Sequence, residues 1–225
     1  MLIRDERGMT VVELLVTMIS VIVVLSAITT ITTAALSSQD RITDRVSVNQ
    51  RARPVMTRII DALHSSCVAQ RVAPVLAGST GTSISFLSKN GSAVTPTPDR
   101  RVISLSGTSL VEQVYPATGG QPPVWTFSST PSQTRTLMTN VAAPGTGQPV
   151  FSYYDYVTGR LNTTPLPTPL STTNAARTAY VTVSFRVNPS GVSQDAKAHL
   201  TINDAADLRL ESAGQFPAQE NLPCM

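Results

Sequence analysis

The sequence contains little charge, and this shortage excludes one class of function. Charged residues occupy 14% of the 225 positions, and the formal net charge is +3. Only Lys89 and Lys197 are lysines, and the arginines are scattered, with Arg100 and Arg101 as the one adjacent pair. Domains that bind nucleic acid usually carry clustered basic residues. We therefore expect no direct contact with nucleic acid.

Reactive side chains are also scarce. His64 and His199 belong to no metal-ligand motif, and Ser109 lacks the second glycine of a nucleophile elbow. Glycine motifs that bind phosphates or dinucleotides are missing. Asp204 and Asp207 alone are too few for a calcium site, so we interpret them as solvated loop charges. The sequence predicts no enzyme, no metal and no cofactor.

The two cysteines, Cys67 and Cys224, lie too far apart in sequence for a CxxC redox or zinc motif. Outside the cytoplasm, a disulfide between them is the natural interpretation, and it would tie the C-terminus to the end of the N-terminal helical region. In a reducing compartment both would be small buried residues. The sequence leaves both possibilities open.

A long uncharged run follows Glu13. Leu14 to Leu36 are 23 uncharged residues, enough at about 1.5 Å per residue to cross a bilayer core of about 30 Å. Serines and threonines dilute its hydrophobicity, but in a helix their hydroxyls can bond back to preceding carbonyls. We expect a membrane-spanning helix.

Two ordinary interpretations of this run are a secretory signal peptide, cleaved near residues 33–35, and a plain signal anchor. The run is longer than the usual apolar region of a signal peptide, about 7 to 15 residues. Arg4 and Arg7 precede it, but more arginines follow, so the charge rule gives no reliable orientation. Neither interpretation explains Gly8 and Glu13.

The stretch "RDERGMTVVELLVTMISVIVVL" (residues 4–25) resembles the type III signal of type IV prepilins and pseudopilins. In that family a membrane peptidase cuts after the glycine, here Gly8, and methylates the new N-terminus, here Met9. Glu13 is the fifth residue from Met9, and the apolar helix that follows is retained. Met9 stands where the family more often has Phe, and the span lacks the proline of many major pilins.

The resemblance implies a role for Glu13. A carboxylate one turn into the helix can pair with the new amine of Met9 on an adjacent subunit, and each group then neutralises a charge that is costly in hydrocarbon. The chain would be a structural minor pilin or minor pseudopilin, active in initiation or at the tip. The implied partners are other pilin or pseudopilin subunits, prepilin peptidase, the inner-membrane assembly platform, and membrane lipid before assembly.

Beyond the span, the sequence predicts an amphipathic helix and then strands. Apolar residues recur at helical spacing, and Pro54 should kink or split this helix. The members of this apolar stripe are Ile42, Val46, Met56, Ile59, Ile60 and Leu63. Residues 179–187 ("AYVTVSFRV") alternate between apolar and polar, which is typical of a half-buried strand. Further strand candidates begin near residues 82, 101, 109, 136, 149 and 198, with loops rich in Pro, Gly, Ser and Thr between them.

We therefore predict an α+β fold in which a long N-terminal helix packs on an antiparallel β-sheet domain. The expected parts are a leader (1–8), a transmembrane or filament-core helix (9–38), an amphipathic continuation (39–71) and a β-rich globular pilin domain (72–225). The chain would be a single-pass cytoplasmic-membrane protein with an extracytoplasmic C-terminal domain, later assembled into a cell-surface or periplasmic filament.

The order of the C-terminal pieces loosely resembles that of J-type minor pseudopilins. A "YYD…TG" strand and turn at 153–159 precedes a proline-rich loop, a long strand and a final "L-x-L" strand at 208–210. The aromatic residues of this strand could form a ligand face, but core on one side and interface on the other is the commoner use. The alternative function is a membrane-anchored or secreted extracytoplasmic β-domain binding protein with an ordinary export signal.

Overall fold

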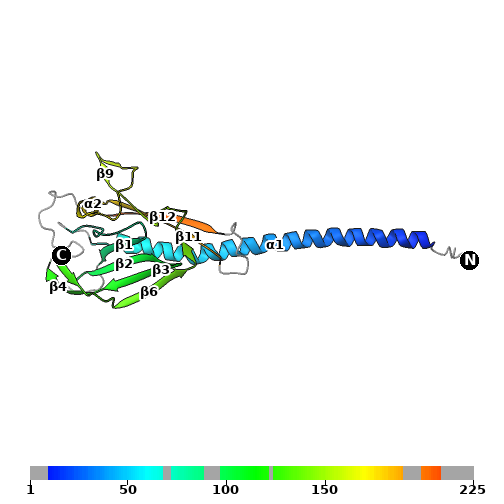
Figure 1. The fold of residues 1–225 in the computed structure, drawn as a ribbon, viewed down its shortest axis with the longest axis horizontal. Helices are drawn as coiled ribbons and strands as arrows, with labels where there is room; N and C mark the ends of the chain where they lie inside the picture. Colours follow the sequence, from blue (N-terminus) through cyan, green and yellow to red (C-terminus); the bar gives the residue numbers. More distant parts are fainter. Residues whose placement is uncertain (1–9, 68–71, 89–96, 122–123, 190–198, 209–225) are drawn as a thin grey trace, which may run out of the picture. The chain divides into compact units, whose positions relative to one another are not determined.

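The computed structural model describes residues 10–67, 72–88, 97–121, 124–189 and 199–208. It contains one long N-terminal helix and antiparallel β-sheets, which confirms the α+β class (Figure 1). The chain divides into two compact units, Met1–Asp44 and Arg45–Met225. The elements are α1 (Val11–His64), β1 (Ser83–Ser88), β2 (Asp99–Ser106), β3 (Ser109–Tyr115), β4 (Ala117–Gln121), β5 (Val124–Phe127), β6 (Gln133–Thr139), β7 (Val141–Ala142), β8 (Phe151–Tyr154), β9 (Tyr156–Val157), β10 (Arg160–Leu161), α2 (Thr172–Arg177), β11 (Tyr180–Val187) and β12 (Leu200–Asp207).

The part of α1 that belongs to the second unit buries one apolar face. Its buried side chains recur every three or four residues, which places them on one side of a helix. They include Val48, Ala52, Met56, Ile59 and Leu63. Burying an isoleucine or leucine side chain fully contributes about 1.5–3 kcal/mol, so this face holds α1 in the unit.

Two features of α1 differ from the sequence prediction. Ile42 and Val46 remain exposed, so the stripe that enters the core begins at Val48. Pro54 does not split the helix, which continues through it from Val11 to His64. Proline removes the hydrogen bond to the carbonyl of Gln50, but the packed residues on either side of Pro54 hold the helical path.

The first large sheet has the strand order β1-β2-β3-β6, and every pairing in it is antiparallel. Residues paired across the strands share a face of the sheet. The buried face carries Ile84, Phe86, Ile103 and Leu110, which join the α1 residues in one hydrophobic core. Glu112 stands on this same face, since it pairs with Ile103.

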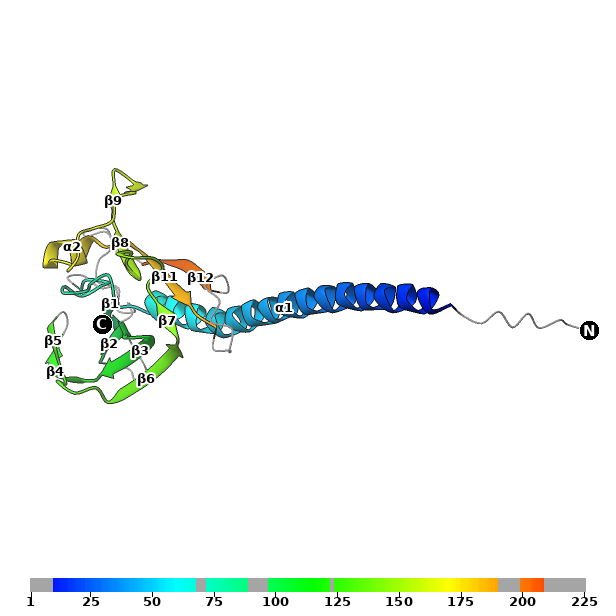
Figure 2. The ribbon, with the colours of Figure 1, turned by 45° about the vertical axis from the view of Figure 1, so that its right-hand side comes forward.

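The second sheet has the order β12-β11-β7, with β8 also paired to β11. Along β11 the residues alternate between buried and half-buried, as the sequence predicted, with Val181, Val183 and Phe185 facing the core. Side chains of both sheets and of α1 form a single core, and Figure 2 shows strands of both sheets around the C-terminal part of α1. The sequence predicted one sheet, and the structure divides the strands between two larger sheets and two two-stranded ones, β4-β5 and β9-β10.

Some loops of the sequence prediction contain secondary structure. β4 and β5 form a hairpin in and beyond the expected loop at 116–123, and Trp125 and Phe127 pack against the small cluster around Cys67. α2 lies in the loop expected before the strand at 179–187, and the Ser171 hydroxyl caps it by accepting from the Asn174 N–H at 3.2 Å. The strand expected near 136–141 breaks at Asn140, whose φ is 59°, into β6 and β7.

Candidate functional site

Thr10 caps the start of α1, and Glu13 lies three residues further on in the first turn of the helix. The Glu13 N–H donates to the Thr10 hydroxyl oxygen at 3.3 Å, and that hydroxyl lies 3.5 Å from Oε2 of Glu13. The Leu14 N–H donates to the Thr10 carbonyl at 3.1 Å, which is the first bond of the helical ladder. Threonine followed three residues later by glutamate before an apolar run is a known helix-start signal. Glu13 therefore has a local role in addition to the predicted charge pairing.

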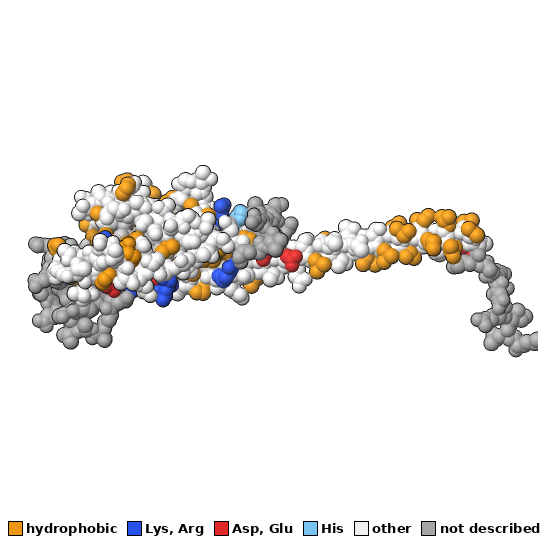
Figure 3. Space-filling view, turned by 60° about the horizontal axis from the view of Figure 1, so that its bottom comes forward, with side chains coloured by type: hydrophobic (Ala, Val, Ile, Leu, Met, Phe, Trp, Pro, Cys, Tyr) orange, Lys and Arg blue, Asp and Glu red, His pale blue; other side chains and the backbone are white. Residues whose placement is uncertain are grey.

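The apolar part of α1 has no covering within its own unit. Its most apolar window of 18 residues has a mean hydropathy of 2.7 and is entirely unburied, and α1 is long and apolar enough to cross a membrane. Hydrophobic side chains cover the N-terminal end of α1 on the face shown in Figure 3. A helix that is apolar on all sides is stable in lipid or inside a protein assembly rather than in water.

The hydroxyl side chains of the apolar run, residues 14–36, are satisfied internally, as the sequence predicted. Ser20 donates to the Val16 carbonyl and Ser26 to the Ile22 carbonyl, each at 2.8 Å. The same bond to a carbonyl three or four residues earlier is made by Thr17, Thr29, Thr30, Thr32, Thr33 and Ser37. These hydroxyls present no unpaired donor to apolar surroundings.

Three of the predicted site residues lie outside the described residues. These are Gly8 and Met9, the predicted processing site, and Cys224, the predicted disulfide partner. Cys67 is fully buried and disulfide-bonded, next to Val72 and Leu87. Its pairing with Cys224 stays a prediction.

The histidines and aspartates that the sequence analysis considered as site residues do not lie together in one site. His64 ends α1 exposed, and His199 directly precedes β12. Asp204 and Asp207 are exposed but lie on β12 rather than in a loop, and their spacing of three puts them on opposite faces of the strand. Among the described residues, no three His, Cys, Asp or Glu side chains gather in a way that could hold a metal ion.

The aromatic residues of β8 and β9 separate into core and surface. Phe151 and Tyr153 are fully buried, and the Tyr153 hydroxyl lies 2.8 Å from the Thr80 carbonyl oxygen. Burial raises the pKa of the Tyr153 phenol. Tyr156 is exposed, and the neighbouring Asp207 carboxylate raises its pKa. The aromatic side chains on one side of β8 therefore belong to the core, which is the role that the sequence analysis favoured for them.

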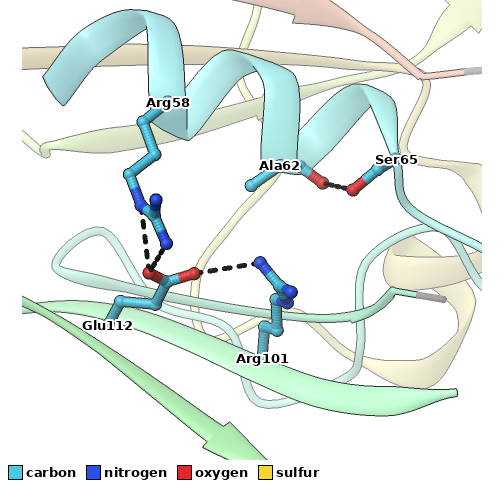
Figure 4. Close-up of polar contacts among 5 residues, drawn as sticks. All are labelled: Arg58, Ala62, Ser65, Arg101 and Glu112. Carbon is cyan, nitrogen blue, oxygen red and sulfur yellow. Dashed lines mark hydrogen bonds and ion pairs between the residues drawn. The ribbon is translucent and has the colours of Figure 1, made fainter. Parts of the chain in front are cut away.

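A charged triad joins α1 to the first sheet (Figure 4). Oε2 of Glu112 on β3 accepts from Nη2 of Arg58 at 2.8 Å and from Nε of Arg58 at 3.2 Å. The other carboxylate oxygen accepts from Nη1 of Arg101 on β2 at 3.1 Å. Side-chain exposure is 44% for Arg58, 13% for Arg101 and 4% for Glu112. Glu112 is therefore a buried carboxylate whose negative charge is compensated by two arginines.

Sequence reasoning missed both Thr10 and the triad, for different reasons. The signal for Thr10 was present as the T-x-x-E spacing at 10–13. No sequence signal could have joined Arg58 to Glu112, because 54 positions separate them and only the fold brings them together.

No family model matches this chain, and no curated protein or solved structure matches it either. Any functional assignment therefore depends on the residues themselves.

Proposed function

We propose that this chain is a non-enzymatic structural subunit of a type IV filament, a minor pilin or minor pseudopilin. It would be cut after Gly8, methylated on Met9 and assembled through the N-terminal part of α1. The observation that carries the proposal is an apolar, uncovered helix with one carboxylate, Glu13, in its first turn, five positions after Gly8 in the sequence.

The physical logic concerns the charge of Glu13. The Thr10 hydroxyl contacts this side chain at the helix start, but it does not neutralise its charge. In apolar surroundings an unpaired carboxylate is unfavourable by about 2.5 kcal/mol or more. An amine on a neighbouring Met9 would compensate this charge, and would thereby fix the axial register of adjacent helices.

The first experiment is to determine the mass and N-terminal sequence of the mature protein from cells with and without prepilin peptidase. A methylated chain that begins at Met9, and that is lost without the peptidase, is the expected result. A chain that begins near residue 36, or an uncleaved chain from Met1, contradicts the proposal. Either would favour the anchored or secreted binding protein instead.

A second experiment separates the two roles of Glu13. Glu13→Val removes both the charge and the side-chain contact with the Thr10 hydroxyl, whereas Glu13→Gln removes the charge but keeps a side-chain oxygen that can accept from this hydroxyl. We expect both variants to be absent from filaments while their globular units melt at the wild-type temperature. Normal incorporation of Glu13→Gln would show that the side-chain contact with Thr10, and not charge pairing, is what the residue supplies.

A further inference from the structure

A groove runs along the exposed face of α1 in the second unit, and nothing in the proposed function uses it. Its volume is about 870 Å³. Most of its lining comes from one helix face, with side chains three or four positions apart, and Arg101 of β2 lies across from them. The lining residues are Gln50, Arg53, Pro54, Thr57, Arg58, Asp61, Ala62, Ser65 and Arg101. Figure 4 shows four of them.

The groove has more hydrogen-bond donors than acceptors. Each of its three arginines offers five N–H groups and no acceptor. Glu112 accepts from two nitrogens of Arg58 and one of Arg101, and Arg53 donates through Nε to Asn49 at 3.0 Å. Nε of Arg101 is buried without a hydrogen-bond partner among the described residues. Asp61 is the one carboxylate in the lining, and Glu112 pairs with Arg58 and Arg101, so three guanidinium groups face two carboxylates and one positive charge remains unbalanced.

The lining also includes Gln50, whose backbone carbonyl is a free acceptor within α1. Pro54 has no N–H, so the carbonyl of Gln50 lacks its usual intrahelical donor. From Gln50 to Ser65 the helix rises about 22 Å, which is far longer than a small anion but matches several residues of extended polypeptide. The lining therefore combines guanidinium groups, which can bind a carboxylate, with a carbonyl that can accept from a peptide N–H.

We propose that this groove binds a segment of a partner protein that carries aspartate or glutamate. Its carboxylate would take the remaining N–H groups of Arg53, Arg58 and Arg101, because planar guanidinium groups match carboxylates in two-point hydrogen bonds. The proposal concerns the second unit and is independent of processing at Gly8. In a filament the partner would be a neighbouring subunit, but the chemistry of the groove does not require a filament.

The test uses the full-length chain in non-ionic detergent micelles and a fluorescein-labelled peptide of Glu-Ala-Ala repeats. Fluorescence anisotropy measures its binding, and the same peptide with Gln in place of Glu is the control ligand. Arg53→Gln is the groove variant, since Arg53 is exposed and donates to Asn49 on its own helix, so the core is untouched. Arg160→Gln on β10 is the matched control, an exposed arginine outside the groove.

We expect the Glu peptide to bind, the Gln peptide not to bind, and Arg53→Gln to weaken binding about fivefold or more with Arg160→Gln unchanged. No binding of the Glu peptide, equal binding of the Gln peptide, or equal weakening by both variants overturns the proposal. Equal weakening by both variants would indicate only a general attraction between the acidic peptide and a positively charged protein. A mature N-terminus at Met9 together with any of these failures would leave the filament assignment intact.

Discussion

Replacing Glu112 with glutamine tests how far the fold depends on the triad. The variant keeps the size of the side chain but removes the charge that compensates Arg58 and Arg101. Removing one partner of a buried ion pair costs about 3–5 kcal/mol, because the remaining charge is left without compensation. Arg58 is 44% exposed, so its guanidinium can turn to water, whereas Arg101 at 13% exposure cannot. We therefore expect the lower end, about 3 kcal/mol.

The assay is denaturant unfolding of the full-length chain in detergent, followed by the fluorescence of Trp125, the only tryptophan. In a thermal melt, a loss of about 3 kcal/mol in the free energy of unfolding would lower the melting temperature of a domain of this size by about 6–12 °C. Arg58→Gln, which leaves Glu112 paired with Arg101, should cost only about 1 kcal/mol. A loss below about 1 kcal/mol for Glu112→Gln would refute the reasoning, because Arg101 would then have found another partner or water.

Two further predictions concern the second unit. Burial raises the pKa of Tyr153 above 10.0, so the unfolded chain loses its proton first. Stability should then fall above pH 10 by up to about 1.4 kcal/mol per pH unit. Tyr153→Phe should flatten this fall in denaturant titrations between about pH 8 and 12, and an unchanged fall would contradict the assignment. Gly120→Ala places a methyl group against the Val124 carbonyl oxygen at a positive φ of 96°, so we expect a loss of about 1–3 kcal/mol. Gly119→Ala, which meets only ordinary contacts, should change stability far less, and equal losses would argue against the clash.

Most of the fold prediction rests on the periodic spacing of apolar residues in the sequence. The alternation at 179–187 predicted β11 and its buried face, because that strand has one side on the core. The helical stripe from Met56 to Leu63 was right for the same reason. Ile42 and Val46 fit the same period but stay exposed, since spacing says which side of a helix is apolar and not how far the core extends.

The errors lie where tertiary contacts overrule local preference. The glycines of β4 favour a loop, yet pairing with β5 and the packing of Trp125 hold them in a hairpin. Pro54 favours a break, yet the buried face of α1 keeps the helix continuous. At the candidate site, the T-x-x-E spacing was readable in the sequence, whereas the groove depends on Arg101 reaching the face of α1 from another element.

The bonds from serine and threonine hydroxyls to carbonyls of α1 bear on how this helix could change its surroundings. A hydroxyl that is bound within its own helix breaks no hydrogen bond when lipid around it is replaced by packed protein, or the reverse. The hydroxyls would then add little to the cost of a transfer between the two media. Glu13 is left as the side chain of this segment whose polar surroundings would have to change.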